Sequence, residues 1–155
     1  MSKEVEDLVR SLYLLGFVQR EIGRRSLVEL GSQGFTSLAA LRKDGPLRVS
    51  EVAERLCVDV SVASRQVNAL IDAGYAQREH DDSDGRAHKV SITEAGVEIL
   101  ARCHRRLVET FAQALAGWSD QEIGSLAHRL DLLREDFSST QALRDRATET
   151  KRSKR

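Results

Sequence analysis

The chain has 155 residues, a formal net charge of zero, one proline and two cysteines. This length suits one domain with an apolar core, and no apolar run approaches the roughly 18 residues that a membrane-spanning helix requires. Two cysteines are too few for a disulfide framework and the first residues lack the apolar core of a secretory signal, so we expect a soluble, cytoplasmic protein.

The first third of the chain predicts two helices. Residues 4–30 carry apolar side chains three and four residues apart, which is typical of a helix with one apolar stripe. Gly31 and Gly34 are expected to break this helix, and a short helix over 36–42 is expected to follow.

The middle of the chain predicts a short helix, a tight turn and a second helix. Ser50 is a suitable N-cap for a helix over 51–56. Asp59, or alternatively Ser61, is suitable for capping the next helix, which is expected to end at Gly74. This succession is that of a helix-turn-helix.

The helix over 60–71 has two distinct faces. One is apolar and expected to be buried, at Val60, Ala63, Val67 and Leu70. The other is short and polar, with side chains at i, i+3, i+4 and i+7: Ser61, Ser64, Arg65 and Asn68. Such a face suits the DNA major groove, where Arg bonds guanine bidentately and Asn reads adenine; a solvated polar face is the alternative. Gln66 joins these four as a candidate contact.

A β-hairpin follows at once. Residues 75–80 and 88–93 predict two strands around an acidic turn that contains Asp84 and Arg86. On the tip of a wing, Arg86 can enter the narrow minor groove, and Asp84 can hold its stem by a charge-assisted bond. A weak surface ion pair is the alternative.

The last third predicts two long helices and a tail. Thr93 begins a helix over 94–116, and the Ser119–Glu122 capping box begins another that reaches residue 137. The segment 138–155 has few apolar residues, so we expect a disordered tail with a basic end that could reach phosphates.

Residues 47–96 resemble the winged helix-turn-helix core of the MarR family of bacterial transcriptional regulators. The features that carry the resemblance are the 51–56 helix, Ser64-Arg65, Leu70 with Gly74, the Asp84-Gly-Arg86 turn and residues 92–96, which lead from the second strand into the next helix. The order of the helices before and after this core also matches, so the resemblance covers about residues 4–137. It implies a mainly α fold in one domain, 1–137, with a winged helix-turn-helix lobe at 35–93 and dimerisation helices at 4–30 and 94–137.

The resemblance also implies a function. Members form homodimers through the N-terminal helix and the last two helices, and bind double-stranded DNA at a near-palindromic operator. Many also bind a small-molecule effector and then lose DNA affinity. We therefore expect a sequence-specific transcriptional regulator, a homodimeric repressor relieved by a ligand. The long apolar stripes at 5–22 and 123–137 independently favour a partner helix, although packing within one chain is the alternative.

Charge argues for a second possibility. From Ser50 to Gly96 five Lys and Arg residues stand against nine Asp and Glu, a net charge of −4. A winged-helix protein-interaction module without DNA binding is therefore the alternative function.

Other chemistry has little support in the sequence. Cys103 and His104 are adjacent on a helix and point apart, and neither a Gly-rich phosphate loop nor an HExxH motif is present, so we expect no enzyme, cofactor or metal.

His80 and His88 can face each other across the wing, as surface residues or as a metal site. Cys57 and Cys103 are expected to be small buried residues, with a reactive thiol as the alternative. Four aromatic residues are candidates for an effector pocket, with the core as the alternative: Tyr13, Phe17, Phe35 and Trp118.

Overall fold

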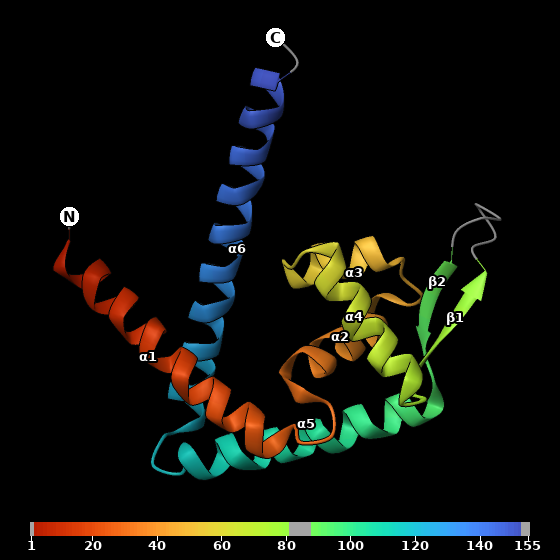
Figure 1. Cartoon of the computed structure of the whole chain (residues 1–155). Helices are drawn as coiled ribbons and strands as arrows, with labels where there is room; N and C mark the ends of the chain where they lie inside the picture. Colours follow the sequence, from red (N-terminus) through yellow and green to blue (C-terminus); the bar gives the residue numbers. More distant parts are fainter. Residues whose placement is uncertain (1, 81–87, 153–155) are drawn as a thin grey trace. The chain divides into compact units, whose positions relative to one another are not determined.

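The computed structural model describes residues 2–80 and 88–152, with side chains described as far as Phe137. Eight elements follow one another in the described chain (Figure 1): α1 (Lys3–Ser26), α2 (Gly31–Asp44), α3 (Val49–Leu56), α4 (Val60–Asp72), β1 (Ala76–His80), β2 (His88–Ile92), α5 (Glu94–Ala114) and α6 (Asp120–Arg152). The predicted mainly helical fold with a small hairpin is confirmed. The chain divides into two compact units, residues 1–111 and 112–155.

The first unit is built around the helix-turn-helix and the hairpin. Figure 1 shows α2, α3 and α4 gathered beside the two strands, with α5 starting at the end of β2. β1 and β2 pair antiparallel, and Leu47 adds an isolated bridge to Val90 through two backbone hydrogen bonds of 3.0 and 2.7 Å. Each of α2–α5 and β2 contributes at least one fully buried side chain to the core: Leu38, Leu41, Val52, Val67, Val90, Ile99 and Cys103.

The start of α2 differs from the sequence prediction. The two glycines do not separate α1 from a short later helix, because α2 already begins at Gly31. Gly31 adopts φ +64°, a left-handed conformation that glycine accepts without strain, and its N–H donates to the Leu27 carbonyl over 2.6 Å. A Cβ on Gly34 would contact Leu30 and, at 3.6 Å, Leu70 of α4. Gly31 therefore allows the chain to turn a corner into α2, and Gly34 allows α2 to approach α4 closely.

The start of α3 also differs from the prediction. The helix begins at Val49 with Arg48 as its N-cap, and Ser50 lies inside the first turn. The Glu51 carboxylate provides the cap bond, because its Oε2 accepts from the Arg48 N–H at 2.7 Å. At α4 the predicted Asp59 is the N-cap residue, with extended backbone, although its side chain makes no capping hydrogen bond.

The junction between the hairpin and α5 is tightly bonded. Thr93 donates its N–H to the Tyr75 carbonyl at 3.1 Å and its hydroxyl to the Gly74 carbonyl at 2.7 Å. The same hydroxyl accepts from the Gly96 N–H at 3.1 Å. Thr93 thus caps α5 as predicted and also holds the end of β2 against the turn that leads into β1.

Most of α1 has no packing partner among the described residues of the first unit. Its last turn is buried at Gly23 and Ser26, and Leu27 follows in the core. Farther toward the N-terminus, apolar side chains of the predicted stripe are exposed at Val5, Leu8 and Leu15. The stripe predicted from the sequence is present, and this unit leaves it uncovered.

The second unit consists of the end of α5, a turn and α6. The predicted capping box is present: the Ser119 N–H and hydroxyl both donate to Glu122 Oε2 at 2.8 Å, and the Glu122 N–H donates to the Ser119 hydroxyl at 3.3 Å. The Ser119 N–H, and after it the hydroxyl, lowers the pKa of the Glu122 carboxyl below its ordinary value. Within this unit Leu126, Leu130 and Phe137 remain exposed.

The end of α6 is another difference from the prediction. The sequence predicts that the last helix ends at 137 and that a disordered tail follows, whereas the backbone stays helical to Arg152. Residues 138–152 contain neither Pro nor Gly, and Ala, Leu, Gln, Arg, Lys and Glu favour helix without needing burial. No helix among the described residues is both long and apolar enough to cross a membrane.

Candidate nucleic-acid interface

α3 and α4 form a helix-turn-helix joined by residues 57–59. Cys57 adopts a left-handed conformation, φ 53° and ψ 44°, and its N–H donates to the Glu54 carbonyl at 3.2 Å. The Val58 N–H donates to the Ala53 carbonyl at 3.1 Å. These bonds end α3 and redirect the chain into α4. Cys57 is exposed, so the expectation that it is buried is wrong, whereas Cys103 is fully buried.

The polar stripe predicted on α4 is present at the surface. Ser61, Arg65 and Asn68 are exposed and Ser64 is half-buried. The opposite face packs into the core through Ala63, Val67 and Leu70, as predicted. Val60 is the exception, because it lies at the first position of the helix and remains 54% exposed.

The candidate side chains on α4 differ in their bonding. Among the described residues Arg65 has no hydrogen-bond or ion-pair partner, so its guanidinium is available to a ligand. Gln66 lies off the stripe and donates to Gln33 Oε1 of α2 at 2.6 Å. Asn68 accepts a hydrogen bond from Arg78 of β1, with 2.7 Å between Oδ1 and Nη2. Gln66 and Asn68 are therefore already engaged within the protein.

Arg78 is the residue near this surface that sequence reasoning missed. The signal for it was the two-residue alternation of β1, in which Arg78 lies on the same face as Ala76. Ala76 is buried, so that face turns toward the rest of the lobe. The long side chain of Arg78 on that face can therefore reach α4.

The hairpin places its strands where a wing is expected. Ala76 pairs with Ile92 and His80 with His88, which confirms the predicted strand pairing. The two imidazole rings face each other with 5.1 Å between centroids and 48° between planes. No group of three or more metal-binding side chains occurs in the part of the chain that the structure describes. Asp84 and Arg86, the predicted wing-tip residues, lie outside the described residues.

A second polar contact ties the α1–α2 corner to α5. Arg106 Nη1 donates to both carboxylate oxygens of Glu29, at 2.8 and 2.7 Å. This bond to Arg106 holds the pKa of the Glu29 carboxyl below its ordinary value. Burial, followed by the nearby Glu29 charge, raises the pKa of the Cys103 thiol above its ordinary value, which disfavours the thiolate form.

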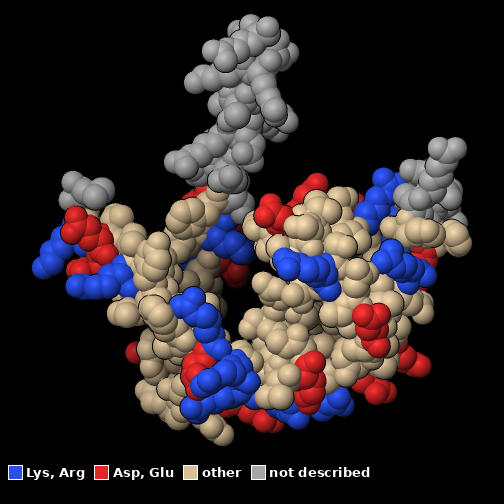
Figure 2. Space-filling model, in the orientation of Figure 1, with Lys and Arg blue, Asp and Glu red and all other residues tan. Residues whose placement is uncertain are grey.

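The surface charge is mixed. On the face drawn in Figure 2, Lys and Arg side chains are interspersed with Asp and Glu side chains. Several cations are also neutralised in pairs, such as Arg55 with Asp44 at 2.6 Å. Any attraction for nucleic acid must therefore come from individual side chains and their positions.

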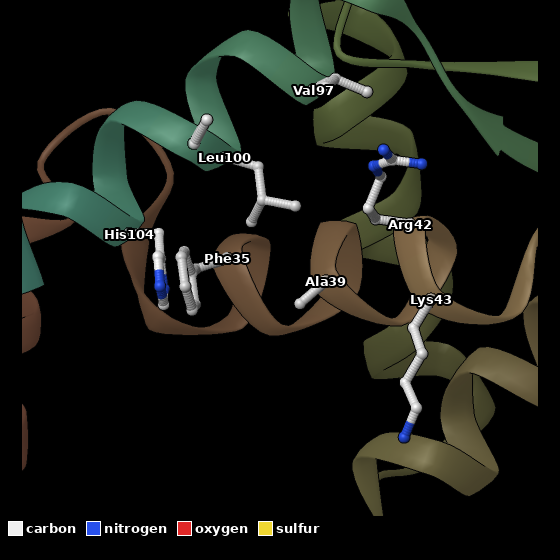
Figure 3. Close-up of a pocket in the computed structure, with 8 residues that line it drawn as sticks. Phe35, Ala39, Arg42, Lys43, Val97, Leu100 and His104 are labelled. Atoms are coloured by element: carbon white, nitrogen blue, oxygen red, sulfur yellow. The ribbon is translucent and has the colours of Figure 1, made fainter. Parts of the chain in front are cut away.

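An open groove of about 410 Å³ lies between α2 and α5. Its apolar part is formed by Phe35, Ala39, Val97, Leu100 and Ala101, and its polar part by Arg42, Lys43 and His104. Figure 3 shows the rings of Phe35 and His104 side by side at one end, Arg42 at the other, and Lys43 directed away from α5. Of the four predicted pocket aromatics only Phe35 lines this groove. Tyr13 and Phe17 line a separate hollow on α1, and Trp118 one on the second unit.

Comparisons with known proteins place this architecture in a family. A family model described as the MarR family matches residues 32–88. The HTH-type transcriptional regulator YxaD of Bacillus subtilis is 35% identical over 105 residues, covering 66% of this chain and 73% of YxaD. The transcriptional repressor MdtR of B. subtilis is 29% identical, covering 81% of this chain and 85% of MdtR.

The fold comparison agrees. A cysteine-to-serine variant of MarR from E. coli, solved in complex with operator DNA, superposes with a TM-score of 0.70 at 19% identity, covering 84% of this chain and 95% of that one. Fold, helix-turn-helix and sequence similarity thus lead to one conclusion: the chain belongs to the MarR family of transcriptional regulators.

Proposed function

We propose that this protein is a homodimeric repressor that binds a near-palindromic operator in double-stranded DNA and is released from it by a small-molecule ligand. The observation that carries the proposal is the exposed polar stripe of α4, on the second helix of a helix-turn-helix. At its centre lies Arg65, which has no partner among the described residues. The similar MarR structure was solved with operator DNA, and the similar MdtR is named a repressor.

Each side chain of the stripe has a role that its chemistry supports. Arg65 presents two parallel donors that match O6 and N7 of guanine in the major groove. Ser61 and Ser64 are small enough to meet phosphates or base edges without obstructing the approach of the helix. In the wing Arg86 would occupy the minor groove, where a narrow width concentrates negative potential, with Asp84 holding its stem.

The homodimer is supported by exposed apolar surface in both units. The α1 stripe leaves Val5 and Leu15 51% and 49% exposed, and α6 leaves Phe137 65% exposed. Apolar side chains in rows along long helices mark an interaction surface, and a second copy of the chain supplies an identical row by two-fold symmetry. Two-fold symmetry of the protein also requires a near-palindromic operator.

The groove between α2 and α5 supports a ligand. Its apolar lining suits a flat apolar body and Arg42 suits an anionic group, which is the usual balance of a small-molecule site. A ligand relieves repression only if it binds the DNA-free state more tightly than the DNA-bound state. Since α2 packs directly on α4 through Gly34, a ligand that displaces α2 would displace the DNA-contacting helix.

The test begins with the full-length protein and a pool of random-sequence duplexes. Selected duplexes are expected to share a near-palindrome, and wild-type protein is expected to shift them at two salt concentrations. In the cell, this binding would take place in the cytoplasm, where the chromosome lies. Failure to enrich any sequence would contradict the proposal and favour a protein-interaction module.

A further inference from the structure

The contact between Arg78 and Asn68 determines which way the Asn68 amide is turned. A guanidinium has donors and no acceptor, so the atom 2.7 Å from Arg78 Nη2 must be the amide oxygen of Asn68. Hydrogen-bond chemistry and the observed geometry therefore give the same orientation of this amide. Oδ1 is held on the side of the hairpin, and the two Nδ2 hydrogens are left for another partner.

The backbone keeps Arg78 in place for this contact. Arg78 pairs with Val90 across the hairpin, and the two side chains of a cross-strand pair project from the same face. Val90 is buried, so the stem of Arg78 starts from the core side of the sheet. The Leu47 bridge to Val90 and the Thr93 bonds to Gly74 and Tyr75 fix the hairpin against α4.

We propose that Arg78 is a positioning residue for base recognition: by holding Oδ1 of Asn68, it makes Asn68 read DNA as a hydrogen-bond donor. This inference rests on the proposed DNA-binding function. A freely rotating Asn amide can turn either its donor or its acceptor toward a base. An amide held by a charged donor must break a charge-assisted bond before it can turn round.

The consequence is a particular base preference. In the major groove guanine, adenine and thymine all present an acceptor, whereas cytosine presents only the N4 amino donor. Donation from Nδ2 therefore favours an acceptor-bearing base edge at the position under Asn68 and disfavours cytosine there. A single hydrogen bond from a neutral amide corresponds to roughly a two- to tenfold preference.

A phosphate contact is the competing role for Arg78. The guanidinium has further donors and lies at the surface, so it could bind the DNA backbone. The two roles differ in their signature: a phosphate contact weakens binding to every sequence alike and lowers the salt slope by about one unit when removed. A positioning role changes the preference at a single base pair in each half-site.

The experiment compares full-length wild type, Arg78→Leu, Asn68→Ala and the double variant. Each is titrated against duplexes that carry all four base pairs, changed symmetrically, at every position of a sequence selected from random duplexes. Asn68→Ala is expected to flatten the preference at one position per half-site. Arg78→Leu is expected to reduce it several-fold at the same position only, and the double variant to match Asn68→Ala within about twofold.

Arg55→Leu is the matched control, because Arg55 is another arginine of this lobe whose guanidinium is bonded within the protein, to Asp44 of α2 and not to Asn68. It removes the same charge and is expected to leave every base preference unchanged. Thermal unfolding checks that each variant is folded. Arg78→Met, which keeps an unbranched stem without a donor, replaces Arg78→Leu if the latter unfolds.

Besides an unchanged Arg78→Leu profile, two results would overturn the inference. One is an equal loss on all duplexes in Arg78→Leu, which makes Arg78 a phosphate contact. The other is a double variant whose loss is the product of the two single losses, which makes the residues independent. A wild-type protein that selects no sequence refutes the proposed function instead, whereas a selective wild type with an unchanged Arg78→Leu profile refutes only the role of Arg78.

Discussion

The α-carbon of Gly96 lies against the carbonyl oxygen of Tyr75, so closely that a Cβ on Gly96 would come within 2.1 Å of this oxygen. The same oxygen accepts the Thr93 N–H at 3.1 Å. It is backbone and already bonded, so it has little freedom to move away. The first turn of α5 thus packs directly on the chain between α4 and β1.

Replacing Gly96 by alanine is expected to destabilise the protein. The added methyl overlaps the Tyr75 oxygen and also comes within 2.8 Å of Ile92 Cγ1. Overpacking of this kind costs about 1–3 kcal/mol, and contact with backbone places the expected cost at the upper end. Urea denaturation at one fixed protein concentration measures the loss.

Gly124→Ala is the matched control. Gly124 lies within α6, and a Cβ at this position would meet no described residue within 4 Å beyond its own stretch of helix. Alanine therefore adds helix propensity there without a clash, and a gain of about 0.5–1 kcal/mol is expected. Equal stability of the Gly96→Ala variant and the wild type would contradict the close packing at this junction.

Arg65→Ala is expected to reduce operator binding by about 1–3 kcal/mol and to relax discrimination at one base pair in each half-site. The reason is the guanidinium at the centre of the α4 stripe, which no described residue engages. Competition titrations measure the affinity of the variant for operator duplexes and for random duplexes. If both kinds of duplex lost affinity equally, Arg65 would be a phosphate contact.

Arg86→Ala is expected to weaken binding without changing the sequence preference in the major groove, because an arginine in the minor groove responds mainly to groove width. Asp84→Ala is expected to act in the same direction and more weakly. The same duplex panel that maps Arg65 measures both. An Arg86→Ala variant with wild-type affinity would remove the wing from the DNA-binding proposal.

The apolar row of α6 is expected to hold the dimer together. Leu130→Asp places a charge in this row and is expected to dissociate or unfold the dimer, whereas His128→Asp adds the same charge at an exposed position outside the row. Sedimentation at low micromolar concentration is the check. A folded wild-type species at the chain mass of 17.3 kDa would contradict a dimer.

The Glu29–Arg106 contact predicts part of the acid sensitivity. The folded protein lowers the pKa of Glu29, so the contact stabilises the fold fully above the ordinary carboxyl pKa of about 4.3 and is lost as the pH falls through the lower, folded-state value. Glu29→Gln is expected to flatten this part of the stability-against-pH curve. Glu98→Gln, at an exposed position on α5 away from this contact, is the control for the removal of a carboxylate as such.

Local patterns in the sequence were sufficient for most of the elements. The Ser119–Glu122 capping box, the two strands and the apolar side of α4 all depend on residues within a few positions of one another, and all are present. The errors also have local causes. A glycine at a left-handed corner gives the same sequence pattern as a glycine that ends a helix, so Gly31 predicts a break. The low apolar content of 138–155 predicts disorder, although the residues there favour helix.

Contacts between distant segments were decided by the tertiary structure alone. Glu29 and Arg106 are 77 residues apart, and the pairing of Arg78 with Asn68 depends on how the hairpin lies beside α4. The sequence determined that α4 carries a polar stripe, because a helical period can be read along the chain. It could not determine which stripe residues are already bonded, because that depends on the distance between side chains that only packing brings together.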